Sequence, residues 1–342
     1  MSGSPTYVDI QELTGLSLST ISKYFNGGNV RERNRITIED AVARLGYQVN
    51  QHARSLRAGR SSTVGVLLPD FGQSSAFHLS IIGGTEEILR SRGIGLIVST
   101  AGARPSGVDF LRARMVDGII AVPDPRDEAE LKAAVARDIP VVLIDRLIDD
   151  VDTDAVVLDN RHAVRIAVDA LVEQGHERIA LICGTDEIWA LRERAAGFDE
   201  ALRAHGITPR PRLIRRGPLT AEFGDLAVQS LMGGDEEIPP TAIVCANDAL
   251  TRGAMGAVVR LGIHVPDTLS VIGFDAEEIA DVTTPPLHYV HQPTRQIAEE
   301  AAQLMIRTLN DESARSARTV VLRARLVAGR SIAAPSGTEP HA

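Results

Sequence analysis

Several features that mark particular protein classes are scarce or missing in this chain. It holds 2 cysteines in 342 residues, without CxxC spacing. Because Cys183 and Cys245 each lie inside an apolar, strand-like run, we expect buried thiols in a reducing compartment rather than a disulfide framework. No apolar run approaches the roughly 18 residues of a membrane span, and no hydrophobic signal segment opens the chain. These absences predict a soluble, cytoplasmic protein.

The sequence motifs of common enzyme classes are also missing. No GxGxxG motif follows a strand into a helix, and neither a P-loop nor a GxSxG nucleophile motif occurs. His288 and His291 form an HxxH pair, but on a strand they would point to opposite faces, which argues against a metal site. We therefore expect no enzymatic activity, no cofactor and no metal ion.

The charge of the chain is unevenly distributed. The formal net charge is −9, yet residues 1–61 hold 8 Lys and Arg against 5 Asp and Glu, so the remaining residues carry −12. An acidic body repels the phosphates of nucleic acids. Phosphate binding should therefore be confined to the basic N-terminal end.

Residues 7–17 show a short helical repeat that a glycine interrupts. Ile10 and Leu13 lie three positions apart and share one face of a helix. Gly15 tolerates the left-handed backbone of a tight turn, and Ser17 is a good N-cap for a second helix over residues 18–26. The pattern predicts two helices joined by a short turn.

The second helix presents one apolar and one polar face. Ile21 and Phe25 stand four apart and point inward. The outer face carries short hydroxyls and one long cation, which reach base edges and phosphates: Ser19, Thr20, Ser22 and Lys23. A third helix over residues 32–45 would close a three-helix core with Ile36, Ile38, Ala41, Val42 and Leu45. This spacing predicts a helix-turn-helix, although a small helical bundle with an ordinary solvated face also fits it.

Residues 46–61 are basic and join this N-terminal part to a different kind of sequence. Leu56 lies among arginines, three residues after the small Ala53. Because a helix this short is only marginally stable alone, we expect it to be ordered only when something binds it.

From residue 62 onward, short apolar runs alternate with amphipathic stretches. The expected strands cover residues 63–68, 94–98, 118–122, 140–144, 178–182, 241–244, 269–273 and 319–326. The expected helices cover residues 79–92, 128–137, 161–174, 191–205, 221–232, 248–261 and 294–309. Nearly continuous apolar strands separated by helices indicate parallel sheets covered on both faces. Since the strands are too many for one ordinary sheet, we expect an α/β fold with two doubly wound lobes.

These patterns divide the chain into four parts. We expect a helix-turn-helix headpiece over residues 1–48, a hinge helix and linker over 49–61, a two-lobed core over 62–335 and a tail over 333–342. Within the core, lobe 1 should take residues 62–160 and 292–318, and lobe 2 should take residues 161–291 and 319–332.

Two groups of motifs stand out. The first lies in the headpiece and hinge: residues 15–26 (GLSLSTISKYFN), Leu45-Gly-Tyr47, Asn50 and residues 53–59 (ARSLRAG). The second lies in the core: Asp145-Arg146, Asp159-Asn160, residues 174–179 (QGHERI), residues 194–198 (RAAGF), Asn247-Asp248, residues 270–275 (SVIGFD) and His291-Gln-Pro293. Together they resemble the LacI/GalR family of bacterial transcription regulators over nearly the whole chain. The resemblance implies a core similar to that of periplasmic sugar-binding proteins.

The resemblance also implies roles in DNA binding. Leu18, Ser19 and Lys23 match positions that touch bases in the major groove. Positions that contact the DNA backbone or hold the recognition helix are matched by Ser17, Thr20, Ser22 and Asn26. The hinge positions that contact DNA are matched by Asn50, Ala53, Arg54, Leu56 and Arg57. Among these, Leu56 matches a leucine inserted into the minor groove, where such a wedge kinks the duplex.

A second candidate site lies in the core. Asp70, Asp145, Asn247 and Asp275 each follow an apolar run, and ligands of α/β proteins sit beyond the carboxyl ends of strands. Carboxylates accept hydrogen bonds from adjacent hydroxyls, and the guanidinium of Arg194 donates two parallel hydrogen bonds. Together these groups suit a polyhydroxylated ligand. The remaining candidate ligand contacts are Phe77, Asn160, Trp189 and Leu219.

Some of these residues have a purely structural alternative. Asp145 and Asp159 either serve the site or cap the helix or turn that follows, and Asn247 is also a good helix N-cap. Trp189, which we expect on a loop, either stacks on a sugar or simply packs. Arg194 lies in the first turns of a helix, where the macrodipole disfavours a cation, so a partner in the cleft is favoured.

The combined prediction is a sequence-specific DNA-binding transcription regulator, and specifically a repressor. It would pair as a homodimer on a near-palindromic double-stranded operator. A small effector, a sugar or a nucleoside-like molecule, would bind between the two lobes and change operator affinity by a coupling free energy of typically ~1–3 kcal/mol. A cytoplasmic solute-binding receptor with a non-functional headpiece is the alternative.

The Leu56→Ala variant tests the wedge. It should weaken binding to a specific operator far more than binding to random-sequence DNA, because only the seated wedge kinks the duplex. The measurement is the Kd of the variant and of the unsubstituted protein for each of the two duplexes. Equal losses of affinity for the two duplexes would show that Leu56 does not act as a wedge.

Overall fold

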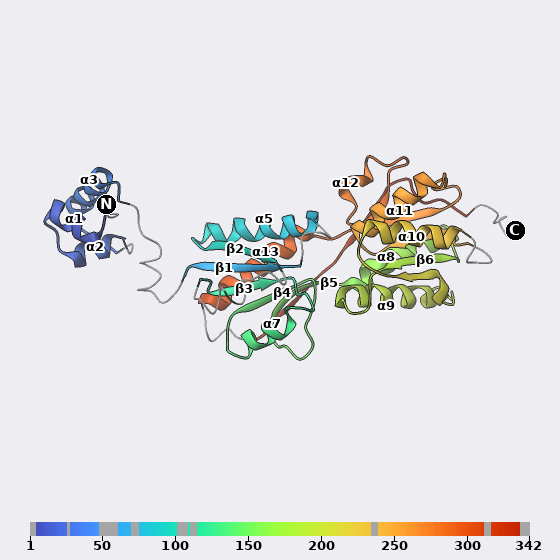
Figure 1. Cartoon of the computed structure of the whole chain (residues 1–342), viewed down its shortest axis with the longest axis horizontal. Helices are drawn as coiled ribbons and strands as arrows, with labels where there is room; N and C mark the ends of the chain where they lie inside the picture. Colours follow the sequence, from blue (N-terminus) through green and yellow to red (C-terminus); the bar gives the residue numbers. More distant parts are fainter. Residues whose placement is uncertain are drawn as a thin grey trace. The chain divides into compact units, whose positions relative to one another are not determined.

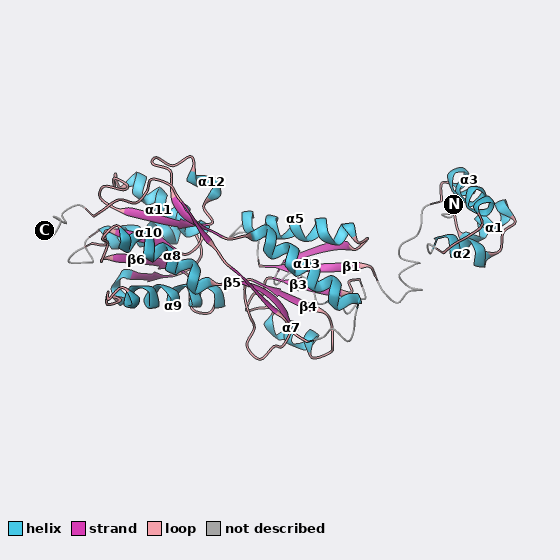
Figure 2. Cartoon of the chain, turned by 180° about the vertical axis from the view of Figure 1, so that it is seen from behind, coloured by secondary structure: helices cyan, strands magenta, loops and turns pink. Residues whose placement is uncertain are grey.

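The structure is a computed structural model that describes residues 5–25, 28–47, 61–69, 75–100, 109, 115–233, 239–310 and 316–335. The chain divides into two compact units, Met1–Ser61 and Ser62–Ala342 (Figure 1, Figure 2). Seven residues of the predicted sites lie outside the described residues: Asn26, Asn50, Ala53, Arg54, Leu56, Arg57 and Asp70.

The first unit contains three helices, α1 (Tyr7–Thr14), α2 (Leu18–Phe25) and α3 (Glu32–Leu45). Gly15 ends α1 in the left-handed region at φ 67°, and the Ser17 hydroxyl caps α2 by accepting from the Thr20 amide at 3.3 Å. The buried centre is formed by Ile10, Ile21, Ile38 and Ala41. Ile36, which the sequence places in this core, is instead 56% exposed. The predicted helix-turn-helix therefore rests on a core smaller than the apolar pattern suggests.

The second unit contains two six-stranded sheets. The first has the order β11-β5-β4-β3-β1-β2, and all of its pairings are parallel. Its strands are β1 (Thr63–Leu68), β2 (Gly95–Thr100), β3 (Gly118–Ala121), β4 (Val141–Ile144), β5 (Asp154–Leu158) and β11 (Thr319–Leu322). Helices α5 (Ser75–Ser91) and α13 (Thr294–Asn310) cover one face, and α7 (Glu128–Val135) covers the other.

The second sheet has the order β12-β10-β9-β8-β6-β7, parallel except for the antiparallel pair β10 and β12. Its strands are β6 (Ile179–Cys183), β7 (Ile214–Arg216), β8 (Ala242–Cys245), β9 (Ser270–Phe274), β10 (His288–His291) and β12 (Arg325–Val327). Helices α8 (Asn160–Glu173) and α9 (Trp189–Ala204) cover one face; α10 (Ala221–Met232) and α11 (Asp248–Arg260) cover the other. The short α12 (Glu277–Ala280) and a 3-10 turn (Pro211–Leu213) lie in connections.

Side chains alternate along the strands because each sheet is covered on both faces. In β1, Val66 and Leu68 pack toward α5 and α13, whereas Leu67 between them packs toward α7. In β6, Leu181 packs toward α8 and α9, whereas Ile182 packs toward α10 and α11. The predicted α/β fold with two doubly wound lobes is thus confirmed.

The last strand region differs from the expectation. The sequence predicts one strand over residues 319–326 and assigns residues 319–332 to lobe 2. The structure has two strands there: β11 pairs with β5 in the first sheet, and β12 pairs with β10 in the second. The chain therefore crosses between the sheets three times, after β5, after β10 and after β11 (Figure 1). Among the described residues, no helix is long and apolar enough to cross a membrane.

Helices α10 and α11 pack closely against each other at Gly253. A Cβ at Gly253 would lie 1.9 Å from the Ala221 carbonyl oxygen of α10, whereas a Cβ at Gly256 would meet no atom within 4 Å. Gly253→Ala should lower the free energy of unfolding by about 1–3 kcal/mol or more, because the helices must separate. The matched control Gly256→Ala, on the exposed side of the same helix, should raise it by about 0.5–1 kcal/mol. Urea unfolding measures both, and equal effects of the two substitutions would contradict the packing.

Candidate effector pocket and DNA-binding surface

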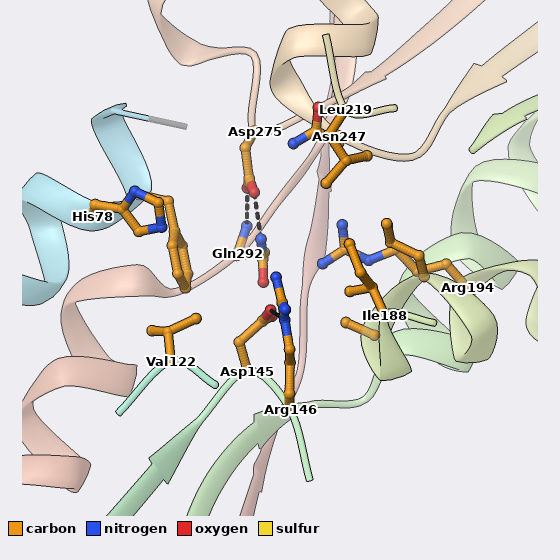
Figure 3. Close-up of a pocket in the computed structure, with 13 residues that line it drawn as sticks. His78, Val122, Asp145, Arg146, Ile188, Arg194, Leu219, Asn247, Asp275 and Gln292 are labelled. Atoms are coloured by element: carbon orange, nitrogen blue, oxygen red, sulfur yellow. Dashed lines mark hydrogen bonds and ion pairs between the residues drawn. The ribbon is translucent and has the colours of Figure 1, made fainter. Parts of the chain in front are cut away.

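A pocket lies where the strands of both sheets end. The space between its lining side chains, open solvent included, is about 500 Å³. We call it the effector pocket and define it by its lining residues: Phe77, His78, Val122, Asp145, Arg146, Ile188, Ala190, Leu191, Arg194, Leu219, Asn247, Asp275 and Gln292 (Figure 3). Several of them directly follow a strand, as expected for an α/β sheet: Val122 follows β3, Asp145 follows β4, Asp275 follows β9 and Gln292 follows β10.

Arg194 points from α9 into this pocket and is only 4% exposed (Figure 3). Its Nε donates to Asn160 Oδ1 at 2.8 Å, its Nη1 donates to the Ala246 carbonyl at 2.6 Å, and its guanidinium lies 3.8 Å from the centre of the Phe274 ring. Burial lowers the pKa of the guanidinium, and the nearby carboxylates of Asp145 and Asp275 oppose that effect. Among the described residues, Nη2 has no hydrogen-bond partner, so one donor nitrogen remains available to a ligand.

Asn160 does not line the pocket. It opens α8 behind Arg194 and is itself buried, with its Nδ2 donating to the Leu158 carbonyl at 3.2 Å. We predicted from the sequence that Asn160 contacts the ligand. In the structure its side chain instead holds the Arg194 guanidinium in place. Asp159, the residue before it, caps α8 by accepting from the His162 amide at 3.1 Å.

Asp275 lies at the end of β9 with a left-handed backbone, φ 50°. Its carboxylate accepts from the Gln292 backbone amide at 3.1 Å and from the Gln292 side-chain amide. Burial raises the pKa of this carboxyl to about 7, while Arg194 and the two Gln292 bonds act in the opposite direction. Burial therefore favours the neutral form of this carboxyl more than in an exposed aspartate.

The two other predicted polar residues of the pocket are held differently. Asn247 caps α11 by accepting from the Leu250 amide at 3.1 Å, and its Nδ2 donates to Asp248. Asp145 has a left-handed backbone at φ 66° and lies 3.8 Å from the Arg146 Nε. Asp145 begins neither a helix nor a turn, so the capping alternative does not apply to it. Asn247 is at once a cap and a lining residue.

Trp189 lies apart from the effector pocket. It is the first residue of α9 rather than part of a loop, and it lines a neighbouring small cavity together with Pro123, Arg146 and Arg192. The start of α9 is hard to recognise because its N-cap, Ile188, makes no side-chain capping bond. Of the other predicted contacts, Phe77 and Leu219 do line the effector pocket.

Sequence reasoning missed several lining residues, among them His78, Arg146 and Gln292. Gln292 is 3% exposed, and within the described part of the chain its Oε1 is buried without a hydrogen-bond partner. Burial lowers the pKa of His78, with Asp145 acting in the opposite direction. The position of Gln292 directly after a strand was a usable signal, as it was for Asp275. No cluster of three or more potential metal ligands occurs among the described residues.

The first unit carries the predicted DNA-reading residues on α2. Leu18 is 43% exposed, and Ser19 and Lys23 are also exposed. The Ser17 hydroxyl lies 2.8 Å from that of Ser19 and 2.9 Å from that of Thr20, so these groups form one hydroxyl cluster at the start of the helix. Ile21 on the opposite side is fully buried. The structure thus presents the expected polar face to solvent.

Substitution of Asp275 should change how stability depends on pH. In the window from about pH 4 to pH 7 the folded protein holds a proton that the unfolded chain has released, so stability falls as pH rises, by on the order of 1 kcal/mol per pH unit. Asp275→Asn should remove this dependence, since the Gln292 amide can turn over and accept from the new amide.

Urea unfolding at several pH values measures the effect. The matched control is Asp281→Asn, at an exposed neighbouring carboxylate. A pH dependence that is the same in Asp275→Asn as in the unsubstituted protein would contradict the assignment.

Known proteins resemble both units. Residues 168–332 match the family model of a periplasmic binding protein-like domain. The HTH-type transcriptional repressor PurR of Vibrio atlanticus (strain LGP32) is 30% identical over 314 residues, covering 90% of this chain and 92% of that protein. The HTH-type transcriptional repressor CytR of Escherichia coli (strain K12) is 30% identical over 307 residues, covering 88% of this chain and 89% of that protein.

Solved structures agree. The lac repressor dimer bound to operator and the anti-inducer ONPF superposes with a TM-score of 0.84 at 25% identity, covering 97% of this chain and 100% of that one. The transcriptional regulator CelR in complex with cellobiose gives a TM-score of 0.72 at 25% identity, covering 96% of this chain and 99% of that one. These findings confirm the prediction of a DNA-binding transcription regulator and not an enzyme. The chain belongs to the LacI/GalR family of bacterial transcription regulators.

Proposed function

We propose that this protein is a cytoplasmic, homodimeric repressor whose operator affinity is set by a small polyhydroxylated effector in the effector pocket. The proposal that an effector binds here rests mainly on the position of Arg194. A buried guanidinium with one nitrogen facing a pocket keeps a donor ready for a ligand, and a hydrogen bond to a charged group is worth about 1.5–3 kcal/mol.

The other polar groups of the pocket complement a ligand with several hydroxyls. The carboxyl oxygens of Asp145 and Asp275 and the buried Gln292 Oε1 are acceptors, and each can accept a hydrogen bond from a hydroxyl group. Apolar side chains of Val122, Ile188 and Leu219 line the same space and can cover the C–H faces of a ring. This mixture of acceptors, one guanidinium donor and apolar walls favours a sugar or a nucleoside-like molecule. The CelR structure, whose ligand is cellobiose, is consistent with that class.

The remaining predicted contacts divide into two groups. Asn160 supports the ligand indirectly, because it fixes the Nε side of Arg194 and thereby aims the guanidinium. Asp70 stays part of the proposal on sequence grounds alone. Trp189 would reach only a part of the ligand that extends beyond Arg146 into the neighbouring cavity.

The DNA-binding side of the proposal rests on α2. Leu18 is suited to apolar contact with a thymine methyl group, Ser19 to a base edge, and Lys23 to a base or phosphate. The lac repressor neighbour is a dimer on its operator, and we propose that two copies of this chain likewise place two headpieces in successive major grooves. A cytoplasmic location follows from that role, since the relatives are named transcriptional repressors.

Arg194→Ala tests the effector site. The full-length protein is first used to select its preferred duplex from fragments of the source genome. Calorimetric titration with a panel of neutral sugars and nucleosides then identifies the effector. Arg194→Ala should weaken binding of that effector by on the order of tenfold or more while the affinity for the selected duplex, without effector, stays unchanged.

The matched control is Arg203→Ala, which removes an exposed arginine from the end of the same helix. It should leave both affinities unchanged. Retention of full effector affinity in folded Arg194→Ala protein would exclude Arg194 from the site. Failure of the unsubstituted protein to prefer any fragment over bulk DNA would contradict the regulator itself.

A further inference from the structure

A threonine lies directly behind the effector pocket. Thr251, in the first turn of α11, is fully buried and does not line the pocket itself. Its hydroxyl donates to the Asn247 carbonyl at 2.7 Å and accepts from the Phe274 amide at 3.1 Å. The donated bond stays within one turn of the helix, as is common for threonine. The accepted bond is different, because it joins α11 to the end of β9, 23 residues further along the chain.

The Phe274 amide depends on this hydroxyl. The pairing of β8 with β9 ends at Val244 and Ile272, two residues before Phe274. The Thr251 hydroxyl therefore takes the place that a strand carbonyl would have as the acceptor. Because Phe274 is fully buried, removal of the hydroxyl would leave a buried donor without an acceptor, which folded proteins avoid.

The rest of the Thr251 side chain is closely surrounded. A Cβ at Gly273 would lie 2.6 Å from the Thr251 methyl carbon, so β9 comes this close to α11 only because residue 273 has no side chain. Burial raises the pKa of the Cys245 thiol, at the end of β8, to about 12, and the Thr251 hydroxyl acts in the opposite direction. Thr251 thus lies where α11 and the ends of β8 and β9 meet.

Both segments that the hydroxyl joins carry groups of the effector pocket. Asn247, whose carbonyl accepts from Thr251, lines the pocket. Phe274, whose amide donates to Thr251, places its ring 3.8 Å from the Arg194 guanidinium and directly precedes Asp275, another lining residue. A single oxygen atom therefore holds the start of α11 against the end of β9.

We propose that Thr251 is a positioning residue of the effector pocket, whose hydroxyl holds Asn247 and Asp275 at the separation that the effector requires. This inference rests on the proposed function, since it needs an effector in this pocket. A binding site loses affinity when its supporting groups let the contacts drift by about 1 Å. Without the hydroxyl, the end of β9 is free to move away from α11, and Asp275 and the ring beside Arg194 move with it.

Two substitutions separate the hydroxyl from the methyl group. Thr251→Val keeps the shape of the side chain and removes the hydroxyl, whereas Thr251→Ser keeps the hydroxyl and removes the methyl group that packs at Gly273. Both should lower the midpoint of urea unfolding, the first because the Phe274 amide loses its acceptor and the second because a buried methyl is lost. A merely structural role would therefore affect both variants alike.

Calorimetric titration of the folded, full-length proteins measures the affinity. The probes are D-glucose, D-ribose, cellobiose, adenosine and cytidine, and the variants are compared on the probes that the unsubstituted protein binds. Thr251→Val should raise the Kd by about tenfold or more, and Thr251→Ser should stay within about threefold of the unsubstituted protein. If Thr251→Val does not fold, Thr251→Ala takes its place, with the same expected loss, because alanine is the better helix former.

The matched control is Thr85→Val, the same exchange at another fully buried threonine of a helix. Thr85 lies in α5 outside the pocket lining, and within the described residues its hydroxyl has no hydrogen-bond partner. The exchange should leave the Kd unchanged and should not lower the midpoint of unfolding.

The outcomes separate the inference from the function on which it rests. Full affinity in folded Thr251→Val, or an equal loss of affinity in Thr251→Ser or in Thr85→Val, overturns the inference while the effector pocket stands. If the unsubstituted protein binds none of the five probes, the proposed effector and the inference are both overturned.

Discussion

A buried cation organises the proposed effector pocket of this protein. The Arg194 guanidinium is removed from water, so its N–H groups need partners inside the protein. Asn160 comes from the start of α8, the Ala246 carbonyl from the end of β8, and the Phe274 ring from the end of β9. One side chain therefore joins the start of α8, the residue after β8 and the end of β9 at a single point. Among the described residues, Nη2 of Arg194 has no hydrogen-bond partner, and we propose that this nitrogen binds the ligand.

The first sheet holds different groups at the carboxyl and the amino ends of its strands. At its carboxyl edge Val122, Asp145 and Arg146 contribute to the effector pocket. At its amino edge Asp117 and Gly95 hold Ser62, the first residue of the core. Parallel strands make this possible, since all their carboxyl ends meet at one edge and all their amino ends at the other. The pocket residues and the residues that hold Ser62 are therefore joined by strands only a few residues long.

Local sequence signals predicted the elements well where a cap or a strong apolar run was present. The bounds of α10 and β1 match the prediction, and Thr220 caps α10 by accepting from the Phe223 amide. The signals failed where no such marker exists: α9 begins after Ile188, which makes no capping bond, and β7 is three residues long with two arginines. Sheet membership of β11 and the place of Asn160 behind Arg194 depend on contacts across the fold, which a local pattern does not encode.

The most direct test of the account is the coupling between the two binding sites. Linkage requires that an effector changes operator affinity by the same factor by which the operator changes effector affinity. The measurement is the Kd for the selected duplex with and without saturating effector, together with the Kd for the effector with and without duplex. We expect one common factor of roughly 5–150 in both experiments. Two sites that both bind and yet leave each other's affinity unchanged would contradict it.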